Sequence, residues 1–123
     1  MRFYLIKGRE YVDRFDVYKN QNGKPFLRNS KKFISVTHFD KWTLVVVCKK
    51  PIGVDVERIR CVDAHLKSYL GIKNSGRYSF FKEWTRREAY IKKHDLVLGN
   101  IKTKKEGKFC TLLFYPYVIS FCF

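Results

Sequence analysis

The sequence predicts an α+β fold in which a small, mostly antiparallel sheet packs against two helices. Short β-rich runs bounded by turn residues occupy both ends of the chain, and apolar residues recur at helical spacing in the stretch between them. A chain of 123 residues with 46% hydrophobic and 17% aromatic residues can bury one modest core. We therefore expect a single domain that extends over residues 1–123.

The first half of the chain is expected to form strands. Met1–Ile6 alternates weakly between apolar and polar residues, as a strand does. Arg14–Lys19 and Lys24–Arg28 flank an Asn-Gly pair at 22–23, which tolerates the positive φ angles of a tight hairpin. A second hairpin is predicted from Thr43–Cys48 and Ile52–Val56, with Lys49, Lys50 and Pro51 in its turn.

The second half changes to a helical period. Gly71 suits the C-terminal cap of a first helix. The apolar positions of that helix lie at i, i+4, i+7 and i+8: Val62, Leu66, Tyr69 and Leu70. After a loop at residues 73–77, a second helix is predicted from Ser79, as its cap, to His94. The two final strands are Phe109–Phe114 and Val118–Phe123, joined at Tyr115, Pro116 and Tyr117.

Three acidic residues are candidates for one metal site. Asp55 and Glu57 alternate along a predicted strand, so their side chains share a face and lie roughly 7 Å apart. Glu88 lies in one row of the second helix with Trp84 and Lys92, because residues four apart share a helix face. Converging carboxylates suit a hard cation such as Mg²⁺, which prefers oxygen ligands and leaves room for phosphate oxygens.

The charge of the chain favours an anionic partner. Its formal net charge is +15 and its pI is about 9.9. Nucleic acid, an acidic protein surface, a membrane face and a phosphorylated cofactor all satisfy that balance, and composition alone does not choose among them.

The four cysteines are irregularly spaced and form no C-x-x-C pair. We therefore expect neither a zinc site nor a redox motif, but reduced thiols in a cytoplasmic protein. The N-terminus has no long apolar segment typical of a signal peptide. The longest apolar run, Phe109–Phe123, is interrupted by Pro116 and is shorter than the ~20 residues of a membrane helix, so no membrane partner is expected.

The acidic stretches resemble the two signatures of the 4'-phosphopantetheinyl transferases. Gly53–Glu57 matches G-[VI]-D-x-E, and Trp84–Lys92 matches W-[ST]-x-K-E-[AS]-x-x-K, with Arg87 in place of a lysine. The two signatures in this order are far more specific than either alone. The resemblance implies a transferase fold and the transfer of the phosphopantetheine arm of coenzyme A to a serine of a carrier protein.

The resemblance also implies a role for each residue. Asp55, Glu57 and Glu88 would hold Mg²⁺ on the pyrophosphate of coenzyme A. Glu88 would also serve as base for the serine, directly or through a water molecule. Lys92 would face the same phosphate oxygens as a point charge. Carrier proteins are usually acidic, so the excess of lysine and arginine would steer such a partner.

Two further stretches resemble the longer, surfactin-synthetase-activating type of the family. Gly23-Lys24-Pro25 is similar to the G-K-P that lines its coenzyme pocket, although Gly and Pro alone more often mark an ordinary turn. Thr37 and His38 keep the hydroxyl and imidazole of its F-N-x-S-H-S motif. Lys24, Thr37 and His38 would then bind coenzyme phosphates. Because so short a chain would form only part of the wall of the coenzyme site, a homo-oligomer is also expected.

Two other functions compete with this interpretation. The chain could be a non-catalytic subunit with the transferase fold that binds a carrier protein. It could also be a small basic nucleic-acid-binding module that uses interleaved aromatic and basic side chains. That second alternative is less favoured, because Asp55, Glu57 and Glu88 would repel a phosphate backbone. Glu88 and Lys92 on their own are also the commonest kind of surface ion pair on a helix.

Overall fold

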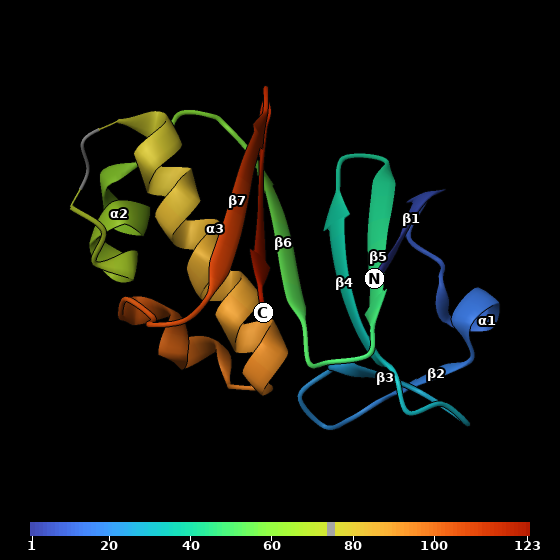
Figure 1. Cartoon of the computed structure of the whole chain (residues 1–123). Helices are drawn as coiled ribbons and strands as arrows, with labels where there is room; N and C mark the ends of the chain where they lie inside the picture. The colour runs from blue at the N-terminus through green and yellow to red at the C-terminus, as the bar shows by residue number, and fades with distance from the viewer. Residues whose placement is uncertain (74–75) are drawn as a thin grey trace.

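A computed structural model describes residues 1–73 and 76–123, so the loop predicted at residues 73–77 lies partly outside the described residues. In those residues the protein has an α+β architecture with antiparallel sheets, as predicted (Figure 1). The strands are β1 Arg2–Lys7, β2 Val17–Lys19, β3 Pro25–Leu27, β4 Phe33–Phe39, β5 Trp42–Cys48, β6 Gly53–Arg58, β7 Phe109–Phe114 and β8 Tyr117–Cys122. The helices are α1 Val12–Phe15, α2 Ala64–Leu70, α3 Arg77–His94 and the 3-10 helix η1 Leu98–Lys102.

The described strands form three sheets rather than the one predicted. Their orders are β1-β5-β4, β2-β3 and β6-β8-β7, with antiparallel neighbours throughout. The predicted hairpin between β5 and β6 is therefore wrong. β5 is a central strand whose Val45 and Val46 are fully buried, and it pairs with β1 on one side and with β4 on the other. β6 consequently pairs with β8 in the next sheet.

Side-chain hydroxyls join two of these sheets edge to edge. β4 and β6 lie next to each other without a backbone ladder (Figure 1). The Ser35 Oγ accepts a hydrogen bond from the Val54 amide at 3.0 Å, and the Thr37 Oγ1 accepts one from the Val56 amide at 3.4 Å. Both hydroxyls are buried, so they replace the main-chain carbonyls that these amides would otherwise need.

The long helix α3 lies directly on β6 because Gly53 has no side chain. A Cβ on Gly53 would lie 1.8 Å from the carbonyl oxygen of Ala89 and 2.8 Å from the amide nitrogen of Lys93. Next to this contact, the buried hydroxyls of Thr85 and Ser120 are 2.7 Å apart and link α3 to β8. These two contacts fix the position of α3 relative to β6.

The helix ends agree closely with the sequence. Asp63 caps α2 by accepting a hydrogen bond from the Leu66 amide at 2.8 Å, and Gly71 ends it with a φ of 63°. The predicted Ser79 cap is wrong: α3 begins at Arg77, Gly76 occupies the cap position, and Ser79 lies in the first turn. The final hairpin of β7 and β8 is confirmed. No helix in the described ranges is both long enough and apolar enough to cross a membrane.

We predict that Gly53→Ala destabilises the fold by about 2–4 kcal/mol, because the added methyl group meets backbone atoms that cannot rotate away. Gly99→Ala is the matched control, since a Cβ at Gly99 meets nothing within 4 Å. Urea unfolding followed by circular dichroism measures both changes. Equal stability of Gly53→Ala and wild type would show that α3 does not approach β6 this closely.

Candidate active site

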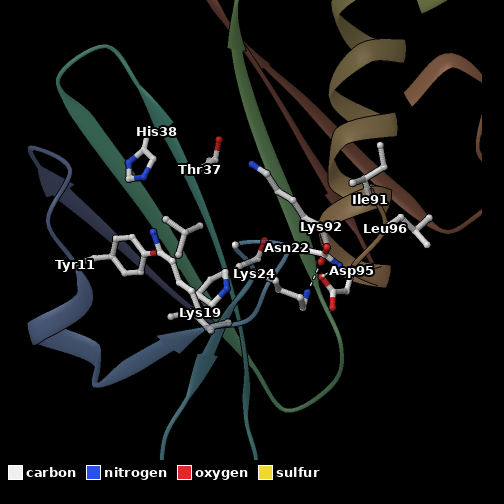
Figure 2. A pocket seen from close by; sticks show the side chains of 15 residues that line it. Tyr11, Lys19, Asn22, Lys24, Thr37, His38, Ile91, Lys92, Asp95 and Leu96 are labelled. Carbon is white, nitrogen blue, oxygen red and sulfur yellow. Dashed lines mark hydrogen bonds between the residues drawn. The ribbon is translucent and has the colours of Figure 1, made fainter. Parts of the chain in front are cut away.

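Four of the candidate residues meet at one cavity of about 350 Å³. Lys24, Thr37, His38 and Lys92 all line it, although they come from the β2–β3 turn, β4 and α3. Figure 2 shows Lys92 extending from α3 toward Thr37. The side chain of Lys19 adds another cation to the wall. The cavity is therefore basic and lies where three separate segments converge.

Lys24 belongs both to a turn and to the cavity wall. Gly23 adopts a φ of +82°, and the Asn20 Oδ1 accepts hydrogen bonds from the amides of Asn22 and Lys24. The Lys24 ammonium donates to the carbonyl of Lys92, and to that of Lys93 at 3.5 Å. These carbonyls belong to the last turn of α3, which has no helical partners for them. Burial lowers the pKa of Lys24, with the charge of Asp95 opposing that effect.

Asp95 connects the β2–β3 turn to the end of α3. It ends the helix with a φ of 53°, and its carboxylate accepts hydrogen bonds from the amide groups of Asn20 at 2.5 Å and Asn22 at 3.4 Å. We did not predict this contact from the sequence. The only sequence signal is an acidic residue directly after the helix, combined with two asparagines in a distant turn.

His38 is held in one tautomer by its neighbours. Its Nδ1 is 2.7 Å from the Thr43 Oγ1, and that hydroxyl donates its hydrogen to the Gly8 carbonyl at 2.5 Å. Since Thr43 has one hydroxyl hydrogen, we assign Nδ1 as the donor to Thr43, which leaves the Nε2 lone pair available. Burial lowers the pKa of His38, and so do Arg9, Lys92 and Lys19. These effects favour the neutral form of the imidazole.

Asp55 is buried next to the cavity, and one of its carboxylate oxygens has no hydrogen-bond partner among the described residues. Its Oδ1 accepts hydrogen bonds from the Lys92 ammonium at 3.2 Å and the Thr37 hydroxyl at 3.3 Å. Its Oδ2 is buried and has no partner among the described residues. Burial raises the pKa of Asp55, and the charge of Lys92 opposes that rise. A buried carboxylate oxygen without a partner is costly, which makes this atom a candidate ligand.

The charge of Asp55 affects the pKa of both Glu57 and Glu88. Burial and the charges of Asp55 and Glu88 raise the pKa of Glu57 to about 7, against the opposing effect of Arg60. Burial and Asp55 also raise the pKa of Glu88, while Lys92 lowers it. Trp84 lowers it too, although its buried Nε1 has no partner that meets hydrogen-bond geometry. The three candidate metal ligands thus share one region of excess negative charge.

The three carboxylates do not form a ready-made metal site in this arrangement. Within the described residues, no group of three or more Asp, Glu, His or Cys side chains is placed to hold a metal ion. Asp55 is paired with Lys92, and Glu57 is paired with Arg60 at 3.2 Å. In donor chemistry the set nevertheless fits a hard cation, because it offers oxygen atoms only and includes the unpartnered Asp55 Oδ2.

Arg87, the departure from the second signature, lies away from the cavity. Its buried guanidinium pairs with Glu83 at 2.9 Å and donates to the carbonyls of Leu70 and, at 3.0 Å, Ile101. It therefore ties α3 to the end of α2 and to η1. The lysine-to-arginine difference is structural here, since the guanidinium reaches two carbonyls and one carboxylate at once.

Comparison with known proteins decides the family. The curated "4'-phosphopantetheinyl transferase gsp" of Aneurinibacillus migulanus is 35% identical over an alignment of 104 residues. The chain belongs to the 4'-phosphopantetheinyl transferase superfamily. The alignment takes in 75% of this chain and 44% of the relative, so the chain spans less than half of the relative's length. No protein-family model matches the chain.

In this member of the superfamily, the two signatures touch through their smallest residues. Gly53 begins the first signature and Ala89 lies within the second, and the backbone of α3 at Ala89 rests on Gly53. This contact places Asp55 within reach of Lys92. Sequence reasoning found the charged residues of both signatures, but it missed the Ser35 hydroxyl and the Lys19 and Asp95 side chains at the cavity.

The raised pKa of Glu57 predicts a pH-dependent stability in metal-free buffer. The folded state favours the protonated side chain, so this group stabilises the fold fully below pH ~4.5 and loses that contribution as pH rises through about 7. Glu57→Gln lacks this titration. Between pH 5 and pH 8 we expect its free energy of unfolding to rise by about 2 kcal/mol relative to wild type.

Urea unfolding in the presence of a chelator measures this difference. Glu106→Gln, at an exposed position, is the control and should follow wild type at both pH values. A constant difference between Glu57→Gln and wild type across this pH range would refute the assigned titration of Glu57.

Proposed function

We propose that this protein transfers the phosphopantetheine arm of coenzyme A to a serine of an acidic carrier protein, with Mg²⁺ bound. We also propose that residues 1–123 form a single domain with the phosphopantetheinyl transferase fold. The observation that carries the proposal is the meeting of Lys24, Thr37, His38 and Lys92 at one cavity beside Asp55. The name of the 35% identical relative gives independent support for the chemistry.

The cavity suits the phosphate-bearing part of coenzyme A. Lys19, Lys24 and Lys92 provide positive charge, and His38 presents a free Nε2 that gains a proton when an anion binds. A volume of about 350 Å³ is at the low end for small-molecule sites, so the rest of the coenzyme would extend out of the cavity. Thr37 would orient a phosphate oxygen while its other contacts hold β4 to β6.

The reaction is a phosphoryl transfer from the coenzyme to serine. The serine Oγ attacks the β-phosphorus, the bond from that phosphorus to the bridging oxygen breaks, and 3',5'-ADP leaves with the electron pair. Glu88 takes the serine proton, directly or through water, and its raised pKa makes its carboxylate a stronger base. Lys92, at the boundary between Asp55 and the cavity, stabilises the charge on the pyrophosphate oxygens.

Asp55, Glu57 and Glu88 would hold the cation. Bound there, Mg²⁺ would neutralise pyrophosphate charge and compensate the charge of Asp55, which raises the pKa of Glu57 and Glu88. Glu57 would exchange its contact with Arg60 for this role. The carrier protein would approach a chain with a net charge of +15, which accelerates encounter with an acidic partner.

A second candidate function is a non-catalytic subunit that binds a carrier protein. It is favoured by the internal pairing of the site, since Lys24 is bound to α3 carbonyls and Asp55 to Lys92. This function predicts capture of the carrier protein without modification.

Mass spectrometry of an apo carrier protein incubated with coenzyme A, Mg²⁺ and this protein tests the proposed activity. We expect a gain of one phosphopantetheine group. Asp55→Asn and Glu88→Gln should each slow the transfer by about 100-fold or more, because they remove a cation ligand and the base. Glu106→Gln is the matched control, since Glu106 is exposed and lies outside the site.

No gain in mass, with a known transferase active in parallel, would contradict the enzymatic function. If the carrier protein is nevertheless captured, the non-catalytic function is supported. Equal activity of Asp55→Asn and wild type would instead show that Asp55 is not required for the transfer and that other residues carry it.

Proton NMR of the imidazole groups tests the proposed anion contact. We expect the pKa of His38 to lie below its ordinary value in the free protein, because burial and three cations disfavour its charged form. Binding of coenzyme A should raise that pKa by about one unit or more. His65, exposed on α2, gives the reference resonance. An unchanged His38 titration at saturating coenzyme would rule out a phosphate at Nε2.

A further inference from the structure

One apolar face runs across both three-stranded sheets. In the β1-β5-β4 sheet it begins with Phe3 and Leu5 on β1, which pair in register with Val46 and Leu44 on β5. In the β6-β8-β7 sheet it continues through Phe121 and then through the β8–β7 pairs. The strand positions of this face, here called the open face, are Phe3, Leu5, Leu44, Val46, Cys48, Cys110, Leu112, Phe114, Ile119 and Phe121.

The two sheets share this face as one continuous surface. Val46, Val54 and Phe121 belong to the same buried cluster, which is drawn from both sheets. The Phe3 ring packs edge-on against Phe121, with 5.7 Å between the ring centroids, and Phe123 stacks on Phe121 at 6.3 Å. The apolar surface therefore extends from β1, at one outer edge, to β7, at the other, with the buried Ser35 and Thr37 of β4 where the two sheets meet.

The other faces of these sheets are covered. α1 and the β2-β3 sheet contribute to the core on the opposite face of β5, and α3 packs on β6 and β8 through Gly53 and Ser120. In the described part of the chain no helix packs on the open face. Its outer side chains remain solvent-exposed: 54% for Phe3, 59% for Leu5, 47% for Leu112 and 73% for Phe114.

The exposed area is large enough for a specific interface. Together with Phe123, these four side chains expose on the order of 500 Å² of apolar surface, at the upper end for the largest patch of a monomer. Two such faces in contact would bury about 1,000 Å², the lower limit for a biological interface.

The composition of the open face indicates what covers it. Of the cations on the same strand faces, Lys7 and Lys108 lie beyond its ends, and Arg58, which pairs in register with Tyr117, forms an ion pair with Asp40 at 3.3 Å. An acidic partner would be recognised by free cations inside the contact, and Arg58 already has a carboxylate partner. A mostly apolar surface matches another surface of the same kind, which a twofold axis supplies.

We propose that two copies of this chain associate through the open face. The unpaired outer edges of β1 and β7 border the contact and are covered or paired in it. The basic cavity stays accessible, because Lys19, Lys24 and Lys92 of its wall come from the β2-β3 hairpin and α3, which lie on the opposite faces of the two sheets. The proposal does not depend on the proposed enzymatic activity.

The net charge of +15 per chain gives this dimer an unusual salt dependence. The two copies repel each other at long range, while the apolar contact attracts them at short range. Salt screens the repulsion and leaves the contact intact, so association should strengthen as ionic strength rises. A complex with an acidic partner would weaken under the same change.

Sedimentation velocity of the purified full chain over a salt series tests the proposal. We expect a concentration-dependent dimer that is strengthened by sodium chloride. Leu5→Asp and Leu112→Asp should each weaken it by about tenfold or more, because they bury a carboxylate in an apolar contact. Val97→Asp is the matched control: Val97 is 60% exposed, lies outside the open face and undergoes the same change in charge. Circular dichroism reports whether each variant is folded.

A monomer at every salt and protein concentration would overturn the proposal. So would a dimer that both Leu5→Asp and Leu112→Asp leave intact, since another surface would then hold it. If wild type is monomeric but binds an acidic carrier protein at low salt, and Leu5→Asp weakens that binding, the open face belongs to an acidic partner and the dimer is refuted.

Discussion

The absence of a side chain at Gly53 determines where α3 lies. Because the helix backbone at Ala89 rests directly on β6, helix and strand have one relative position, and a methyl group at Gly53 would disturb it. Lys92, one turn after Glu88, then reaches Asp55 across this contact. The charged residues of both signatures are therefore positioned by two residues that carry no charge.

The same polar contacts hold the fold together and build the site. The Thr37 hydroxyl joins β4 to β6 and also contacts Asp55, while Lys24 closes the end of α3 and lines the cavity. Burying the carboxyl groups costs free energy, which is reflected in the raised pKa of Asp55, Glu57 and Glu88. A site of this kind is stabilised when a cation and an anion bind together, since each compensates charges that the protein leaves unbalanced.

Local signals in the sequence predicted the local features of the fold. Gly71 and the Asn-Gly pair at 22–23 mark a helix end and a turn, because left-handed backbone favours glycine there. Strand pairing was not predictable in this way. Nothing near β6 reveals that β8, more than fifty residues later, is its partner in place of β5. The three carboxylates came from strand alternation and helix spacing, and the coenzyme-binding candidates came from the resemblance. Asp95 and Ser35 act through contacts between distant segments and leave no local pattern.

The central claim is that the unpartnered oxygen of Asp55 serves a cation that binds together with a phosphate anion in the adjoining cavity. Isothermal titration of coenzyme A into the protein, with Mg²⁺ and with a chelator, measures this coupling directly. We predict that Mg²⁺ strengthens coenzyme binding to wild type and has no effect on binding to Asp55→Asn. An equal gain from Mg²⁺ in both proteins, or no gain in wild type, would contradict the claim.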